Sequence, residues 1–222
     1  MKSAGIGVVG RSQERELLQV KAWNPRDYAT GNYRRVDERP FGGGPGMLML
    51  NEPLSACLEA IRGDSDVPAK LIYLSPQGQP LTQAKAKQLA SCSRLILLCG
   101  RYEGVDHRVR EHLVDGEISV GDVVLSGGEV AACLVIEAVT RLREGAMGNA
   151  VSTITESFGE SGLLEEPQFT RPAEFRGWDV PDVLRSGDHA RIDRWRRAQR
   201  LHRTLRDRPD LIEKIGGLST YH

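Results

Sequence analysis

Two short, continuous apolar runs constrain the fold of this 222-residue chain more than any other feature. The runs KLIYL (70–74) and RLILLC (94–99) show no polar alternation, and a segment with helical spacing (82–90) lies between them. Strands that are apolar on both faces and separated by helices are typical of parallel sheets covered on both sides. We therefore predict an α/β domain built on a parallel sheet. Further helices are predicted at 53–62 and 128–142, a strand at 17–23 and a loop over 24–46.

Glycine-bearing loops follow the predicted strands. They are SPQG (75–78), GRYEGVD (100–106) and SVGDVVLSGGE (119–129). Ligands of such sheets bind at the carboxyl ends of the strands, so three loops meeting there indicate a ligand site. In the third loop, an apolar wall beside exposed backbone groups suits a purine ring, whose face the wall takes and whose edge the backbone takes. Taken by itself, that loop is better interpreted as a buried strand followed by a Gly-Gly turn.

Two other loop features could have either a functional or a purely structural role. The charged residues of GRYEGVD are either part of a site or a structural salt-bridge cluster, and we favour the site because charged loops at strand ends often carry function. The motif GGGPG (42–46) lacks the Gly-Lys-Ser/Thr ending of a phosphate-binding loop. It is either a tight turn or a mobile loop whose bare backbone approaches a ligand.

The character of the chain changes near residue 148. Residues 148–162 are small and polar, and a helix is predicted over 188–205. Residues 171–208 hold 11 Arg and no Lys against 6 acidic residues, a local clustering typical of nucleic-acid partners. The excess of 24 Arg over 6 Lys in the whole chain could also come from a GC-rich coding sequence. The core-facing residues of the helix are predicted to be Ile192, Trp195, Ala198, His202 and Leu205.

Several classes of protein are disfavoured. No apolar run approaches the roughly 20 residues of a membrane span, and the start of the chain is unlike a secretory signal, so we expect a cytoplasmic protein without a membrane partner. No G-x-G-x-x-G fingerprint is present. Cysteines never occur at C-x-x-C spacing, so we predict neither a metal site nor a redox pair; they are Cys57, Cys92, Cys99 and Cys133.

Five segments in order resemble one known family. They are RPFGGGPGM (39–47), YLSPQG (73–78), LLCGRYEGVD (97–106), SVGDVVLSGGE (119–129) and PQFTRP (167–172). Together they look like the bacterial tRNA (guanine-N1)-methyltransferases of the SPOUT, or trefoil-knot, class. The resemblance implies a sheet whose C-terminal part is knotted, S-adenosylmethionine as cofactor, and methylation of guanine N1 at tRNA position 37, beside the anticodon. It also implies a homodimer with each active site at the subunit interface, and it makes Mg²⁺ a second candidate cofactor.

The resemblance also assigns roles to individual residues. Guanine N1 carries a hydrogen, so methylation needs a general base, and negative charge then builds on O6. Glu156 matches the family's base, an Asp, while Arg141 matches an essential Arg that would contact O6 or a phosphate. Residues implied to bind tRNA are Ser152, Arg171, Arg194 and Arg197. Residues implied to bind the cofactor are Tyr73, Leu74, Ser75, Pro76, Gly100, Arg101, Tyr102, Glu103, Gly104, Ile118, Val120, Gly121, Asp122, Val123, Val124, Leu125, Gly127 and Gly128.

The resulting domain prediction has three parts. Residues 1–147 form the knotted cofactor-binding domain, 148–162 a linker, and 163–222 a small helical domain that binds the anticodon stem-loop. The family has a further strand and an FPEMF-like segment before the point that matches residue 1. We expect added upstream residues to raise the melting temperature or the cofactor affinity. Two other functions stay open: a trefoil-knot enzyme with another target, such as a ribose 2′-hydroxyl, and a non-catalytic RNA- or cofactor-binding protein.

Overall fold

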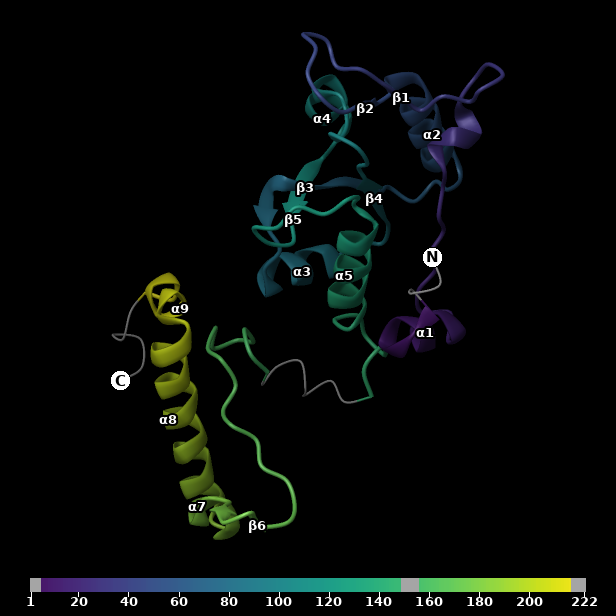
Figure 1. The fold of residues 1–222 in the computed structure, drawn as a ribbon. Helices are drawn as coiled ribbons and strands as arrows, with labels where there is room; N and C mark the ends of the chain where they lie inside the picture. Colours follow the sequence, from purple (N-terminus) through teal and green to yellow (C-terminus); the bar gives the residue numbers. More distant parts are fainter. Residues whose placement is uncertain (1–4, 149–155, 217–222) are drawn as a thin grey trace. The chain divides into compact units, whose positions relative to one another are not determined.

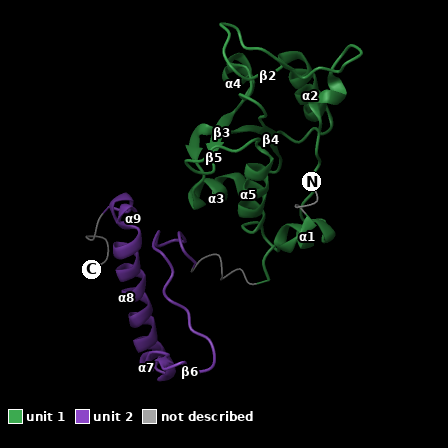
Figure 2. Ribbon diagram, viewed as in Figure 1, with its two compact units in different colours: residues 1–148 green, residues 149–222 purple. Residues whose placement is uncertain are grey.

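The computed structural model describes residues 5–148 and 156–216, and the chain divides into two compact units, 1–148 and 149–222 (Figure 2). A parallel sheet of three strands forms the centre of the first unit (Figure 1). Its strand order is β4-β3-β5, with β3 at Lys70–Pro80, β4 at Leu95–Cys99 and β5 at Gly116–Ser119. The predicted parallel sheet is therefore confirmed.

Side chains of β3 alternate between two hydrophobic clusters, one on each face of the sheet. Leu71 and Tyr73 pack with helices α2 (Asn51–Gly63) and α4 (His107–Leu113). Ile72 and Leu74 pack with helices α3 (Gln83–Ala90) and α5 (Glu129–Thr140). Because both faces of the strand are buried, its sequence reads as a continuous apolar run. The prediction of helices on both faces is confirmed, as are the predicted helices that correspond to α2, α3 and α5.

The predicted strand at 17–23 is wrong. This stretch has no regular structure between α1 (Gly7–Glu14) and the 3-10 turn η2 (Pro25–Tyr28). Its side chains make local contacts instead: the ammonium of Lys21 lies 4.2 Å from the centre of the Trp23 ring and 2.6 Å from the Asp64 carboxylate. The predicted loop over 24–46 also contains a short strand, β1 (Asp37–Glu38), which pairs antiparallel with β2 (Leu48–Met49).

The second unit is built around one long helix, α8 (His189–Asp207), as predicted. The Asp188 carboxylate caps its start by accepting from the backbone N–H of Arg191. A β-hairpin, β6 (Glu174–Phe175) and β7 (Trp178–Asp179), and a short helix, α7 (Asp182–Arg185), precede α8. Helix α9 (Pro209–Lys214) follows it.

The predicted core face of α8 is only partly correct. Ile192 is buried, but Ala198, His202 and Leu205 are exposed. The buried side is set by polar contacts with the segment that precedes the hairpin. The hydroxyl of Thr204 accepts from Leu164 N–H at 2.9 Å, and the guanidinium of Arg200 lies 2.5 Å from the Glu166 carboxylate. A helical wheel that counts only apolar residues misses such a face.

The buried carboxylate of Glu166 is charged. Burial by itself would raise the pKa of this group, but the hydrogen bond from Arg200 and the charge of Arg196 hold it below its ordinary value. The side chain of Glu166 is 6% exposed, so its two arginines are committed to the fold of the unit. Among the described residues, no helix is long and apolar enough to cross a bilayer.

Candidate functional site

The parallel sheet brings two of the three predicted loops to one edge, whereas the third prediction is wrong: SPQG (75–78) continues strand β3 rather than forming a loop. Gly100–Gly104 follows the carboxyl end of β4, and 120–128 follows the carboxyl end of β5. The two loops are joined, since Gly128 N–H donates to the carbonyl of Gly100 at 2.9 Å and Arg101 forms a β-bridge with Gly127. The guanidinium of Arg101 also lies 2.7 Å from the Glu129 carboxylate. Glu129 was not singled out from the sequence, although it closes the loop motif.

Close backbone approach explains the glycine at position 128. A Cβ added there would lie 2.7 Å from the Cα of Cys99 and 3.2 Å from the nitrogen of Gly100. Its backbone has ordinary helical angles, so the requirement for glycine is spatial rather than conformational. The junction between the two loops therefore tolerates no side chain.

Tyr73 supports the loop after β4 from beneath. Its ring is 6% exposed, and a Cβ added at Gly104 would lie 2.7 Å from its hydroxyl oxygen. Burial raises the pKa of Tyr73, so its hydroxyl is neutral at physiological pH. Leu74 and Ser75 are buried as well, whereas Pro76 is exposed. The first three of these predicted cofactor residues thus lie under the loop surface rather than on it.

The GGGPG motif borders the same loop. Glu103 N–H donates to the carbonyl of Met47 at 2.9 Å, and Met49 N–H donates to the carbonyl of Gly104 at 3.0 Å. Gly46 has a left-handed backbone with φ of 86°, and a Cβ there would collide with the Glu103 side chain. The motif therefore lies beside the loop after β4, and its approach to a ligand stays a prediction.

Asp106, in contrast, has a structural role. Its carboxylate accepts from the backbone N–H of Arg108, at the start of α4, and from the Arg108 guanidinium at 2.8 and 2.9 Å. The Arg108 guanidinium holds the pKa of Asp106 well below its usual range. The salt-bridge interpretation of GRYEGVD is therefore right for Asp106, and it also holds for Arg101, which pairs with Glu129. Arg101, Tyr102 and Glu103 remain on the loop that faces the site.

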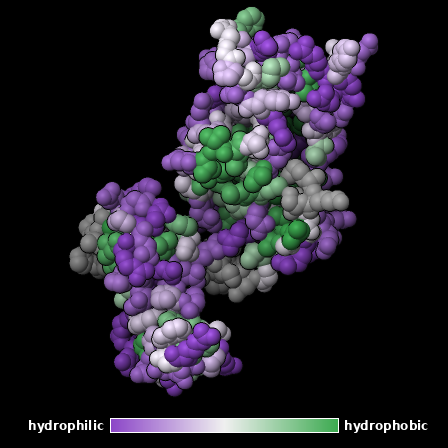
Figure 3. Space-filling model, in the orientation of Figure 1, coloured by the Kyte–Doolittle hydropathy of each residue, from purple (hydrophilic) through white to green (hydrophobic). Residues whose placement is uncertain are grey.

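The apolar wall of the third loop is open to solvent. Val123, Val124 and Leu125 are 56%, 89% and 41% exposed, and Val130 and Leu134 continue the apolar surface along α5. Figure 3 shows hydrophobic side chains gathered on this face of the first unit. An exposed apolar surface of this kind marks a ligand or partner site. Gly121, Asp122 and Gly127 lie in the same stretch of loop.

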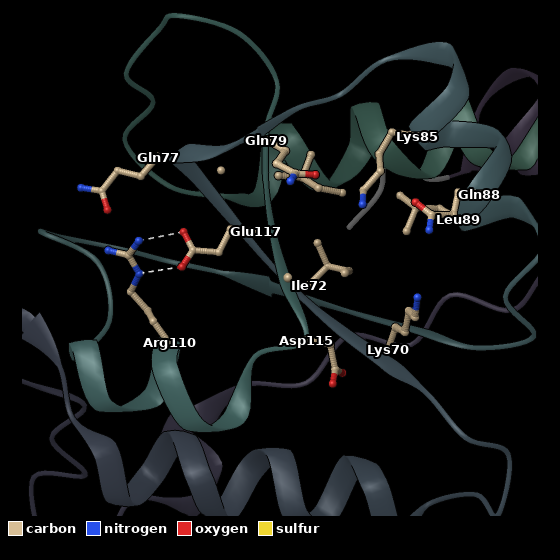
Figure 4. A pocket seen from close by; sticks show the side chains of 13 residues that line it. Lys70, Ile72, Gln77, Gln79, Lys85, Gln88, Leu89, Arg110, Asp115 and Glu117 are labelled. Carbon is tan, nitrogen blue, oxygen red and sulfur yellow. Dashed lines mark hydrogen bonds and ion pairs between the residues drawn. The ribbon is translucent and has the colours of Figure 1, made fainter.

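A separate cavity of about 430 Å³ opens on the β3–β5 side of the sheet (Figure 4). Charged and amide side chains line it, and Arg110 and Glu117 form a bidentate ion pair across it at 2.8 Å. Ile118 is its only lining residue among the predicted cofactor residues. The cavity lacks both the apolar wall and the loop after β4, so we place the candidate site at the joined loops.

The joined loops contain few side chains that could take part in catalysis. Burial raises the pKa of the Cys99 thiol to about 11, so this side chain is a neutral thiol at physiological pH. Among the residues that the structure describes, no three His, Cys, Asp or Glu side chains are grouped as metal ligands. Arg141 directly follows the last residue of helix α5 in the first unit, and Glu156 belongs to the second unit. The predicted substrate contact Ser152 lies outside the described residues.

The predicted tRNA-binding arginines lie in the second unit. Arg171, Arg194 and Arg197 are exposed, and no carboxylate of the described residues lies within 4.0 Å of their guanidinium groups. Most other arginines of 171–208 are paired, for example Arg206 with Asp207 at 2.6 Å. The three predicted positions are therefore among the few whose charge is uncompensated.

Comparison with known proteins gives consistent matches. Residues 2–214 match the family model described as tRNA (Guanine-1)-methyltransferase TrmD. The chain is 60% identical over 214 residues to a tRNA (guanine-N(1)-)-methyltransferase of Stenotrophomonas maltophilia (strain K279a), covering 96% of this chain and 85% of the relative. It is 58% identical over 214 residues to the protein of that name from Xanthomonas axonopodis pv. citri (strain 306), with the same coverage of 96% and 85%.

Proposed function

The chain belongs to the tRNA (guanine-1)-methyltransferase family, and from this premise we propose how its residues perform the reaction. It is a transferase that methylates N1 of the guanosine at position 37 of tRNA, with S-adenosylmethionine as methyl donor. One observation carries the assignment of the site: two glycine-bearing loops of the family segments are joined at the carboxyl edge of the sheet, beside an exposed apolar wall.

The joined loops would form the binding site of the methyl donor. Val123 and Leu125 would pack against the adenine face, while backbone N–H and C=O groups around Gly121 and Gly127 would bind its polar edge. Gly100–Gly104 would hold the ribose and methionine parts. Tyr73 and its buried neighbours would not contact the donor; they would pack under this loop and fix its position. When bound, S-adenosylmethionine supplies an electrophilic methyl group on its sulfonium.

Two side chains would prepare the guanine. The Glu156 carboxylate takes the proton from N1, so that the nitrogen lone pair becomes the nucleophile. The Arg141 guanidinium donates to O6, where negative charge builds as the proton leaves, or to a neighbouring phosphate. Glu156 stands where the family has Asp, and its carboxylate is the same group on a longer arm. Magnesium stays a second candidate cofactor, and none of these steps assigns it a ligand.

We also propose the family's architecture for this chain. The loops after β4 and β5 would belong to a trefoil knot, a topology that ordinary connection rules make very rare. Residues 1–147 would be the cofactor domain, 148–162 a linker and 163–222 the tRNA-binding domain. A homodimer with the active site at its interface would cover the exposed Val124, Val130 and Leu134. The protein would work in the cytoplasm, where tRNA is modified.

Product analysis tests the proposed function. Wild-type protein is incubated with unmodified tRNA and S-adenosylmethionine, and the RNA is digested to nucleosides. The proposal requires 1-methylguanosine. A 2′-O-methylated nucleoside would instead identify a different target, and binding of cofactor without any methylated product would identify a non-catalytic protein.

The uncompensated arginines should carry the salt dependence of tRNA binding. We expect Arg194→Ala and Arg197→Ala each to weaken binding and to flatten the slope of log affinity against log salt by up to about 0.9, because each releases one phosphate contact. Arg206→Ala is the matched control, since Asp207 already neutralises this side chain at 2.6 Å. Equal slopes for all three variants and the wild type would place the tRNA elsewhere.

A further inference from the structure

The β-hairpin of the second unit exposes two large aromatic side chains. Phe175 and Trp178 are 54% and 68% exposed, and their ring centres lie 6.0 Å apart with the planes tilted by 56°. Every residue from Arg171 to Asp179 is exposed. The two hydrophobic clusters of the described residues lie entirely in the first unit, so neither ring belongs to a core.

The hairpin is closed by its own backbone rather than by packing. Arg176 and Gly177 form its two-residue turn, with φ of 56° and 80°, the left-handed geometry that matches the twist of the strands. The Glu174 carboxylate accepts from Gly177 N–H at 2.6 Å, and Val180 N–H donates to the carbonyl of Ala173 at 2.9 Å. Phe175 and Trp178 are directly paired across the strands, so both rings project from the same face.

An arginine lies against these rings, on a hairpin that also carries the carboxylates of Glu174 and Asp179. The guanidinium of Arg176 lies 5.2 Å from the centre of the Phe175 ring and has no carboxylate partner among the described residues. Figure 1 shows β6 and α7 beside the N-terminal end of α8. Arg191, in the first turn of α8, has no carboxylate of the described residues within 4.0 Å of its guanidinium. Arg194 and Arg197 continue this charge along the helix. Exposed aromatic rings next to unpaired arginines have the composition of a single-stranded nucleic-acid surface.

We propose that Phe175, Trp178 and Arg176 form a stacking platform for an unpaired nucleobase of the tRNA substrate. Proteins recognise unpaired RNA bases by stacking them on aromatic rings and guanidinium planes. The tilted rings and the guanidinium over Phe175 offer both kinds of surface, and the nearby arginines attract the backbone of the same RNA. This inference rests on the proposed function, because it takes tRNA as the ligand.

The test compares Trp178→Ala with Trp178→Phe in the full-length protein. Affinity for unmodified tRNA is measured at fixed salt, together with kcat and KM for methyl transfer. Loss of one stacked base should lower the affinity of Trp178→Ala by about 5- to 150-fold. KM for tRNA should rise, while kcat at saturating tRNA and cofactor affinity stay unchanged. Trp178→Phe keeps a ring and should retain most of the affinity.

A control removes exposed apolar surface without removing a ring. Leu205→Ala, on α8, is 42% exposed in the wild type and should bind tRNA normally. Wild-type affinity of Trp178→Ala would overturn the proposal, and so would equal losses in the Ala and Phe variants with a lowered melting temperature, which would mean a structural ring. If Trp178→Ala had a lower mass in solution than the wild type, the hairpin would instead be an interface between copies of the chain, and the proposal would be wrong. The proposed function is tested separately by the turnover of the wild-type protein. The stacking proposal is tested by the ratio of the tRNA affinity of each variant to that of the wild type.

Discussion

Glu156→Ala is expected to lower the rate of methyl transfer by about 10²–10⁴-fold, the usual contribution of a positioned general base. Without a carboxylate at this position, we expect N1 of the guanine to keep its proton, and its lone pair then stays delocalised into the ring and is a poor nucleophile. Cofactor binding should survive, since we propose the joined loops of the first unit, and not Glu156, as the binding site of the donor. Single-turnover methylation and cofactor titration measure the two effects independently.

Three further variants sharpen this result. Glu156→Gln keeps the size of the side chain but cannot accept the proton, so it should be as slow as Glu156→Ala. Glu156→Asp keeps a carboxylate, with the shorter side chain of the family, and should retain most of the wild-type rate. Glu160→Ala removes an exposed carboxylate close by in the sequence and should be silent. A near-normal rate for Glu156→Ala would reject this residue as the base.

Gly128→Ala is expected to disrupt both the fold and the cofactor site. The new Cβ would meet the Cα of Cys99 at 2.7 Å, so one of the two backbone segments would have to shift. Overpacking of this kind costs about 1–3 kcal/mol of unfolding free energy. Loss of the bond from Gly128 to Gly100 should also lower cofactor affinity by about tenfold. Thermal unfolding and cofactor titration give the two values.

Gly63→Ala is the matched control for this substitution. Nothing lies within 4 Å of a Cβ at that position, which ends helix α2. It should leave cofactor affinity unchanged and should not destabilise the protein. If Gly128→Ala behaved in the same way, the junction of the loops would be loose, and it could not be what shapes the cofactor site.

The sequence predicts the central strands because both of their faces are buried. It does not predict that β3 continues to Pro80, because Gln77 and Gln79 are polar and the register against β5 shifts after Leu74. Strand β5, with only four residues and a glycine at its start, lacks a detectable period. The apolar residues of 17–23 gave a false strand because local contacts of Lys21 and Trp23 replace a sheet partner.

The location of the site was more predictable than its chemistry. Parallel strands bring their carboxyl-end loops together, so the meeting of Gly100 with Gly128 follows from the fold class. The neighbouring position of Gly46 depends on hydrogen bonds between loops, which no periodicity encodes. Residue patterns alone named neither the methyl donor nor guanine. Those came from the order of five segments, and the family match over residues 2–214 bears them out.

The choice of base at tRNA position 37 tests the central claim most directly. Two transcripts that differ only in carrying G or A at this position are incubated with wild-type protein and methyl-labelled S-adenosylmethionine. Adenine carries an N6 amino donor where guanine has O6, so it offers no acceptor to the guanidinium proposed for Arg141. Label should therefore enter the G transcript and stay at background in the A transcript. Equal labelling of both transcripts, or none in the G transcript, would contradict guanine-N1 methylation by this protein.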